Sequence, residues 1–163
     1  MKIRFAFYKY TKKPLNAFIA GWTWLPNINT PPYSHVEIGF KLENEWRYFS
    51  STMRDGGKGT RWIGEKDLFE HSERWDIYSL KVDSTIGQVA RCTNIKGRKY
   101  DVLGLTGFVF PFGLLNRRKY WYCSEACYYV LTGKWRRRVS PRGFYKFLFE
   151  TYRLEFKKIY FDS

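Results

Sequence analysis

Several residue types that mark particular classes of protein are scarce in this chain. Its 163 residues include only three cysteines and two histidines. Three is an odd number at low density, which argues against a disulfide framework and favours either a reducing compartment or a thiol with a function of its own. The longest apolar stretch, residues 102–115, contains three glycines and a proline. It is shorter than the roughly 20 residues of a spanning helix, and the first residues carry no apolar signal core. We therefore expect a cytoplasmic protein without a transmembrane segment.

Acidic residues are also scarce. The chain has 15 Asp and Glu against 29 Lys and Arg, for a formal net charge of +14. Hydrophobic residues make up 44% and seven tryptophans are present, so the chain has the material for a core and disorder is excluded. We expect a single domain over residues 1–163. Its charge predicts an anionic partner: a peptidoglycan-type peptide, a lipid, an acidic protein or nucleic acid.

Strand patterns gather in the first half of the sequence and helix patterns in the second. Strands are expected over residues 2–9, 34–42, 46–52, 74–80 and 154–160. Helices are expected over residues 15–24, from Ser84 and Thr85 to Gly97, from Cys123 to Gly133, and from Ser140 onward. This order predicts an α+β fold in which helices cover one side or end of an antiparallel sheet.

The two histidines limit where imidazole chemistry can occur. His71 stands among charged residues and is expected to be solvated. His35 lies in a predicted strand, where alternation places His35, Glu37 and Gly39 on one face and the apolar residues between them on the other. An imidazole beside a carboxylate is a candidate general base, and a solvated strand face is the alternative.

Cys123 stands at the predicted start of a helix. Free amides and the helix dipole at this position stabilise a thiolate, and a nearby imidazole would take its proton. The same amides could bind an oxyanion. The alternative for a free cysteine is a small buried hydrophobe, which suits Cys127 better. A metal site of Cys123, Cys127 and His35 would lack the second ligand pair typical of zinc sites, so we expect no metal and no cofactor.

The strand Ser34–Ile38 and the helix start Tyr122–Glu125 resemble the circularly permuted papain-like thiol hydrolases. This group contains the YiiX-like hydrolases and lecithin:retinol acyltransferase and is related to the NlpC-type cell-wall peptidases. Residues 99–104 and 140–145 match as well. The resemblance implies a permuted papain-like fold, with a half-barrel sheet packed against helices and a nucleophile at a helix N-terminus.

The resemblance also implies roles for individual residues. Cys123 would be the nucleophile and His35 the general base, with the third polar member near Ser50. Glu37 could replace Ser50, although side chains at i and i+2 of a strand stand about 7 Å apart. Further candidates for the oxyanion or substrate site are Tyr100, Tyr122 and Ser124.

Two basic clusters flank Cys123 in the sequence. One consists of Arg117, Arg118 and Lys119, and the other includes Arg136, Arg137 and Arg138. We expect them to lie near the mouth of the thiol cleft and to bind an anionic group. A solvated face with counterions is the alternative.

These observations favour a cysteine-dependent hydrolase or acyl-transfer enzyme of the amidase, peptidase or thioesterase class. A Cys123–His35 pair would cleave an amide, ester or thioester bond. The alternative is a non-enzymatic basic protein, encoded by a phage or mobile element, that binds nucleic acid or an acidic protein in the host cytoplasm. A lytic cell-wall peptidase is a third, weaker hypothesis.

Overall fold

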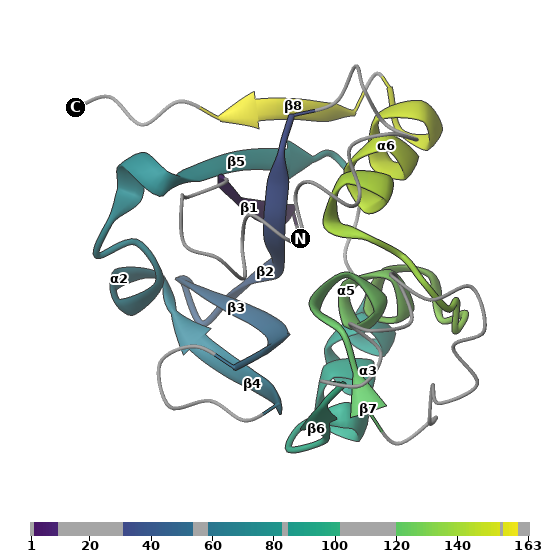
Figure 1. Ribbon diagram of the computed structural model, residues 1–163. Coiled ribbons are helices and arrows are strands. Elements are labelled where there is room, and N and C mark those ends of the chain that lie inside the picture. The colour runs from purple at the N-terminus through teal and green to yellow at the C-terminus, as the bar shows by residue number, and fades with distance from the viewer. Residues whose placement is uncertain are drawn as a thin grey trace.

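One curved sheet organises the part of the chain that the structure describes. This computed structural model describes residues 2–9, 31–53, 59–82, 85–101, 120–153 and 155–159. Within these ranges the sheet has eight strands in the order β7-β6-β4-β3-β2-β1-β5-β8 (Figure 1). The strands are β1 Ile3–Lys9, β2 Tyr33–Leu42, β3 Glu45–Thr52, β4 Gly59–Gly64, β5 Trp75–Leu80, β6 Lys99–Tyr100, β7 Tyr120–Trp121 and β8 Phe156–Ile159. The α-helices are α2 Glu65–Leu68, α3 Ile86–Ile95, α5 Cys123–Thr132 and α6 Pro141–Thr151.

The central strands follow their side-chain patterns. β2 and β3 form the expected hairpin, in which Glu43 and Asn44 adopt φ angles of 48° and 69°. Two successive residues with positive φ make the tight turn whose twist matches that of the flanking strands. β1 pairs with β2 on one side and with β5 on the other, both antiparallel, so its buried side chains lie at the centre of the sheet.

Three helices begin and end at the residues that predict them. The Gln88 side chain accepts a 3.0 Å hydrogen bond from the Thr85 amide before α3, as in a capping box. α5 ends at Gly133, whose φ of 71° is the left-handed conformation that favours glycine. Ser140 caps α6 by accepting a 3.0 Å hydrogen bond from the Gly143 amide, with Pro141 at the first helical position.

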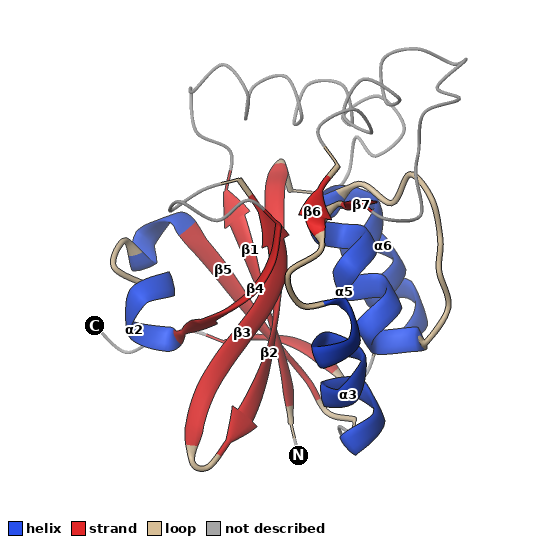
Figure 2. Ribbon diagram, turned by 90° about the horizontal axis from the view of Figure 1, so that it is seen from below, coloured by secondary structure: helices blue, strands red, loops and turns tan. Residues whose placement is uncertain are grey.

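The two faces of the sheet are covered differently. α3, α5 and α6 lie on one side of the strands and the short α2 lies on the other (Figures 1 and 2). The larger core forms on the side of α5 and α6; it includes Phe5, Phe7, Ile38, Phe49 and Phe144. The smaller core on the opposite face is formed by Ala6, Tyr48, Leu68 and Ile77.

β2 separates its side chains between these two faces, as alternation predicts. Val36, Ile38 and Phe40 are buried in the larger core. His35 belongs to the other face, where its ring lies 6.2 Å from the ring of Trp75, a residue that packs on the smaller core. The sheet therefore has an apolar side beneath the helices and a side that carries buried polar groups.

Some elements differ from the sequence-based expectation. β4, α2, β6 and β7 were not predicted. Strands of two residues and a helix of four have no periodicity to detect, and the six residues of β4 follow a glycine-rich turn and begin and end with glycine. β6 and β7 pair in parallel, so the sheet is not purely antiparallel. The expected helix over residues 15–24 lies outside the described residues.

None of the described helices combines the length and the apolar character needed to cross a membrane.

Candidate active site

The first feature of the site is an opening between β2 and β3, which we call the fork. Backbone pairing of the two strands runs from Leu42 opposite Glu45 to Ile38 opposite Phe49. Both strands continue beyond that point, and side chains then bridge them. The Ser50 hydroxyl donates a 2.7 Å hydrogen bond to the Val36 carbonyl. The Cys127 Sγ of α5 lies 3.7 Å from the Val36 carbonyl oxygen and 3.9 Å from that of Phe49, so α5 packs into the fork.

The start of α5 points toward the end of the fork where β2 begins. The Ser51 hydroxyl donates a 2.7 Å hydrogen bond to the carbonyl of Trp121, just before the helix. Because Cys127 lies beside Phe49, the helix runs from the level of Ser51 to the level of Phe49. Cys123 is the first helical residue and is buried. The first intrahelical hydrogen bond of α5 runs from the Ala126 amide to the Tyr122 carbonyl. The backbone amides of the first turn, including that of Cys123, come before it and donate no hydrogen bond within the helix.

The second feature is a buried chain of charged and polar groups on β2 and β4. His35 Nε2 lies 2.9 Å from Glu37 Oε1, and Glu37 Oε2 lies 2.8 Å from Nη1 of Arg61. Arg61 pairs with Ser50 in the register of β3 and β4, so its side chain crosses β3 to reach Glu37. The spacing of i and i+2 side chains does not prevent contact, because the imidazole and carboxylate lean toward one another.

The charge of Glu37 determines how the imidazole is used. Burial by itself would raise the pKa of Glu37, but the positive charge of Arg61 and the hydrogen bond from His35 outweigh it, and the pKa is lowered. Glu37 is therefore ionised at neutral pH and can only accept hydrogen bonds. The proton of a neutral imidazole must then reside on Nε2, which leaves Nδ1 as the basic nitrogen.

Two of the three thiols are unsuited to nucleophilic chemistry. Burial raises the pKa of the Cys127 thiol, and the nearby Cys123 and Glu37 raise it further. Burial also raises the pKa of Cys92. Both remain protonated at neutral pH, which agrees with the expectation that Cys127 is a small packing residue. Their reactivity can therefore be distinguished from that of Cys123.

The other candidates for catalysis take different places. The Ser50 hydroxyl donates its hydrogen bond to the Val36 carbonyl, so its role as a third catalytic member stays a prediction. Ser124 donates its hydroxyl hydrogen bond to the Val139 carbonyl, and its place in an oxyanion or substrate site stays a prediction. The rings of Tyr100 and Tyr122 lie 5.4 Å apart beside the start of α5. Burial, followed by the charge of Tyr100, raises the pKa of Tyr122, so its hydroxyl stays protonated.

The basic segment after α5 returns to the start of the helix. Residues 134–138 begin at the C-terminal end of α5, and the Arg138 amide donates a 2.8 Å hydrogen bond to Glu125, two residues after Cys123. The side chains of Arg136, Arg137 and Arg138 are exposed. This cluster therefore runs along α5 toward the thiol end. Arg117, Arg118 and Lys119 lie outside the described residues.

Sequence reasoning missed Arg61 and the structural use of Glu125. Arg61 could not be found because its strand, β4, follows a glycine-rich turn and was not predicted. Glu125 accepts from the Arg138 amide, whereas a capping role at the helix start was considered from the sequence. A buried carboxylate such as Glu37 needs a cation beside it, but the chain has 29 Lys and Arg, so the sequence does not identify which one pairs with it.

The lowered pKa of Glu37 makes stability depend on pH. Its contribution is fully present above the ordinary carboxyl pKa of 4.5 and is lost as pH falls through the lowered value of the folded state. We expect the free energy of unfolding of the wild type to fall more steeply below that point than the free energy of Glu37→Gln. Urea unfolding at a series of acidic pH values measures both, and equal slopes would contradict the assignment of an ionised Glu37.

The described features define a class: an α+β protein with a strongly curved sheet and a helix that opens with cysteine and packs against a strand bearing a buried His–carboxylate pair. Among solved structures, the chain is similar to the metalloprotein YiiX from Escherichia coli O157:H7. The TM-score is 0.57, the match covers 99% of this chain and 96% of that chain, and the identity is 12%. At this identity the likeness shows a YiiX-like fold and no more. No family model and no curated protein matches the sequence.

Proposed function

We propose that this protein is a cysteine-dependent hydrolase or acyl-transfer enzyme with a permuted papain-like fold. The observation that carries the proposal is the hydrogen bond between His35 Nε2 and the ionised Glu37, because it holds the imidazole in the tautomer that acts as a base. The fork and the direction of α5 support it, since both lead Cys123 to the end of β2 that bears His35. Proton transfer requires that Cys123 Sγ and His35 Nδ1 come within hydrogen-bond reach across the fork.

The reaction follows from these roles. His35 Nδ1 takes the proton of Cys123, and the thiolate attacks the carbonyl carbon of an amide, ester or thioester. The new C–S bond places the carbonyl electrons on oxygen. When the tetrahedral intermediate collapses, the bond to the leaving group breaks and the His35 imidazolium gives it the proton. Water, or another acyl acceptor, then attacks the acyl-cysteine while His35 removes its proton, and the thiolate is released.

The first turn of α5 is positioned to stabilise the oxyanion. The Cys123 and Ser124 amides lie before the first intrahelical hydrogen bond, at the positive end of the helix dipole. The Ser124 hydroxyl is held by Val139, which fixes the backbone of this turn. Glu37, anchored by Arg61, stabilises the imidazolium that forms during each transfer.

The His, Cys, Asp and Glu side chains that the structure describes do not suggest a metal-binding role for this protein. YiiX of E. coli is described as a metalloprotein. Among the residues that this structure describes, no group of three His, Cys, Asp or Glu side chains is arranged to hold a metal ion. Cys127 makes its contacts with backbone carbonyls, and Glu37 is engaged by His35 and Arg61. These residues therefore fit an acid–base and nucleophile assignment better than a ligand set.

The test is the capture of an acyl-enzyme. Purified protein is incubated with an activated ester, an activated amide and a thioester of the same acyl group, quenched in acid and digested for peptide mass spectrometry. We expect at least one of them to acylate Cys123 in the wild type, with no adduct at Cys92 or Cys127. Cys123→Ser provides the matched control. Failure of all three substrates to acylate Cys123, or undiminished turnover by Cys123→Ser, would contradict the proposal.

A further inference from the structure

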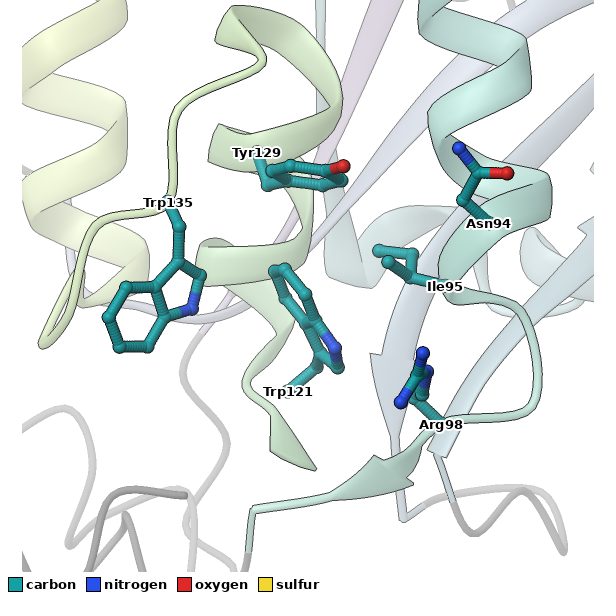
Figure 3. Close-up of a pocket in the computed structure, with 6 residues that line it drawn as sticks. All are labelled: Asn94, Ile95, Arg98, Trp121, Tyr129 and Trp135. Carbon is teal, nitrogen blue, oxygen red and sulfur yellow. The ribbon is translucent and has the colours of Figure 1, made fainter. Parts of the chain in front are cut away.

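A pocket lies on the helix side of the sheet, away from the polar chain of His35, Glu37 and Arg61. Its volume is about 520 Å³, within the range of roughly 300–1,000 Å³ common for ligand sites. The lining residues are Asn94, Ile95, Arg98, Trp121, Tyr129 and Trp135 (Figure 3). They come from α3 and the turn after it, from β7, from α5 and from the basic segment that follows α5.

The chemistry of the wall is aromatic, with two polar groups. Trp121 and Tyr129 pack with their ring centroids 5.1 Å apart, and Trp135 adds a third ring. The Arg137 guanidinium lies 4.8 Å from the centroid of the Trp135 ring, which brings a cation against the aromatic wall. Figure 3 shows the Arg98 guanidinium and the Asn94 amide on the side of the pocket formed by α3. Planar rings stack on such walls, while an amide and a guanidinium suit ring edges and phosphate.

The two segments that supply most of the pocket's lining carry positive charge and lack acidic residues. Residues 84–100 and 126–149, which supply most of its lining, contain no Asp or Glu. Lys96, Arg98 and Lys134 are exposed there. Ion pairs between described residues all use other cations, such as Arg4 with Glu65 and Lys158 with Asp76. Among the described residues, no carboxylate therefore pairs with Lys96, Arg98 or Lys134.

We propose that this pocket binds a base of a single-stranded nucleic acid, whose neighbouring phosphates contact Arg98 and the exposed cations beside it. The combination of stacking rings with a positive border is what sequence-tolerant binding of single strands requires. A mononucleotide would need only one or two cations, whereas exposed cations stand both in the turn after α3 and in the segment after α5. A lipid headgroup would use the cations but not the aromatic wall. The site is separate from the proposed hydrolase chemistry and does not depend on it.

Fluorescence anisotropy of a labelled, mixed-sequence single-stranded DNA of about 16 nucleotides tests the proposal. We expect salt-sensitive binding by the wild type. Trp135→Ala should weaken it about tenfold while Trp135→Phe retains most of it, because the ring is what stacks. Arg98→Ala, at an exposed position that folding tolerates, should reduce the slope of log K against log salt by about 0.7.

Matched controls separate the pocket from diffuse charge. Lys157→Ala removes an exposed cation from β8, at the sheet edge opposite β7, and should leave both affinity and slope at wild-type values. Cys123→Ser should bind as the wild type does, so that loss of acyl transfer and loss of binding are told apart. No binding at low salt, or equal effects of Lys157→Ala and Arg98→Ala, would overturn the proposal. Full competition by an equal concentration of a mononucleotide, or binding of phosphatidylglycerol vesicles in place of the oligonucleotide, would overturn it as well.

Discussion

Replacing His35 with alanine is expected to slow the alkylation of Cys123 by iodoacetamide at about pH 6 by at least about tenfold. In the wild type, the imidazole accepts the thiol proton and the helix N-terminus stabilises the thiolate, so Cys123 reacts below the pH at which an ordinary thiol ionises. Without the imidazole only the helix end remains. The measurement is the rate of adduct formation at Cys123, followed by peptide mass spectrometry as a function of pH.

The controls use the remaining histidine and cysteines. His71→Ala removes the other imidazole, which is exposed at the start of a short 3-10 helix, and should leave the rate unchanged. Cys92 and Cys127 should stay unmodified, because burial raises the pKa of both thiols. Equal rates in the wild type and His35→Ala across the pH range would show that no Cys123–His35 ion pair forms.

The second large effect is expected from Glu37→Gln, which should lower kcat by about 10²- to 10⁴-fold with little change in KM. A glutamine keeps the size of the side chain but loses the charge, so it neither fixes the proton on Nε2 nor stabilises the imidazolium. The readout is steady-state turnover of whichever acyl substrate modifies Cys123, together with the pH profile of kcat.

Glu65→Gln is the matched control for this variant. Glu65 also accepts from an arginine, with 2.9 Å between its Oε1 and Nη1 of Arg4, but it lies on α2 and touches no candidate catalytic residue described here. It should therefore keep wild-type turnover. Arg61→Lys retains a positive charge beside Glu37 and should lose less activity than Glu37→Gln. A Glu37→Gln protein that folds and turns over at the wild-type rate would remove Glu37 from the mechanism.

Much of the fold could be predicted where a local pattern is long. β1, β2, β3 and β5 follow runs of aromatic and β-branched residues, and α3, α5 and α6 begin or end at residues with clear capping chemistry. β4 pairs with the preceding β3 but follows a glycine-rich turn, whereas β6 and β7 depend on pairing between distant segments. Gly59, for example, pairs with Lys99, a contact that no short window of sequence contains. The single domain over residues 1–163 stays a prediction.

The candidate site, like the fold, could be predicted only in part. Alternation along β2 places His35 and Glu37 on one face and predicts their proximity, and the residues around Cys123 predict a helix start. The partner of Glu37 could not be predicted, because Arg61 comes from an unpredicted strand and the chain has 29 Lys and Arg. The fork could not be predicted from the sequence either, because it forms where side-chain hydrogen bonds from Ser50 and Ser51 take the place of backbone pairing between β2 and β3.

The structure shows where part of the net positive charge lies. Residues 134–138 run along α5 and reach its first turn at Glu125. That the basic side chains lie at the mouth of a thiol cleft stays a prediction. The same segment supplies Trp135 to the aromatic pocket. The exposed cations of this segment therefore belong to the stretch of chain that contacts the first turn of α5 and also lines the proposed nucleic-acid site, and the variants of Trp135 and Cys123 separate the two functions.

The most direct test of the central claim is the distance between Cys123 Sγ and His35 Nδ1 in a crystal structure of the wild-type protein. We expect the two atoms to lie within about 4 Å of each other across the fork, with His35 Nε2 hydrogen-bonded to Glu37. A structure in which Nδ1 faces away from Cys123, with the thiol enclosed by apolar side chains, would contradict the proposed catalytic pair.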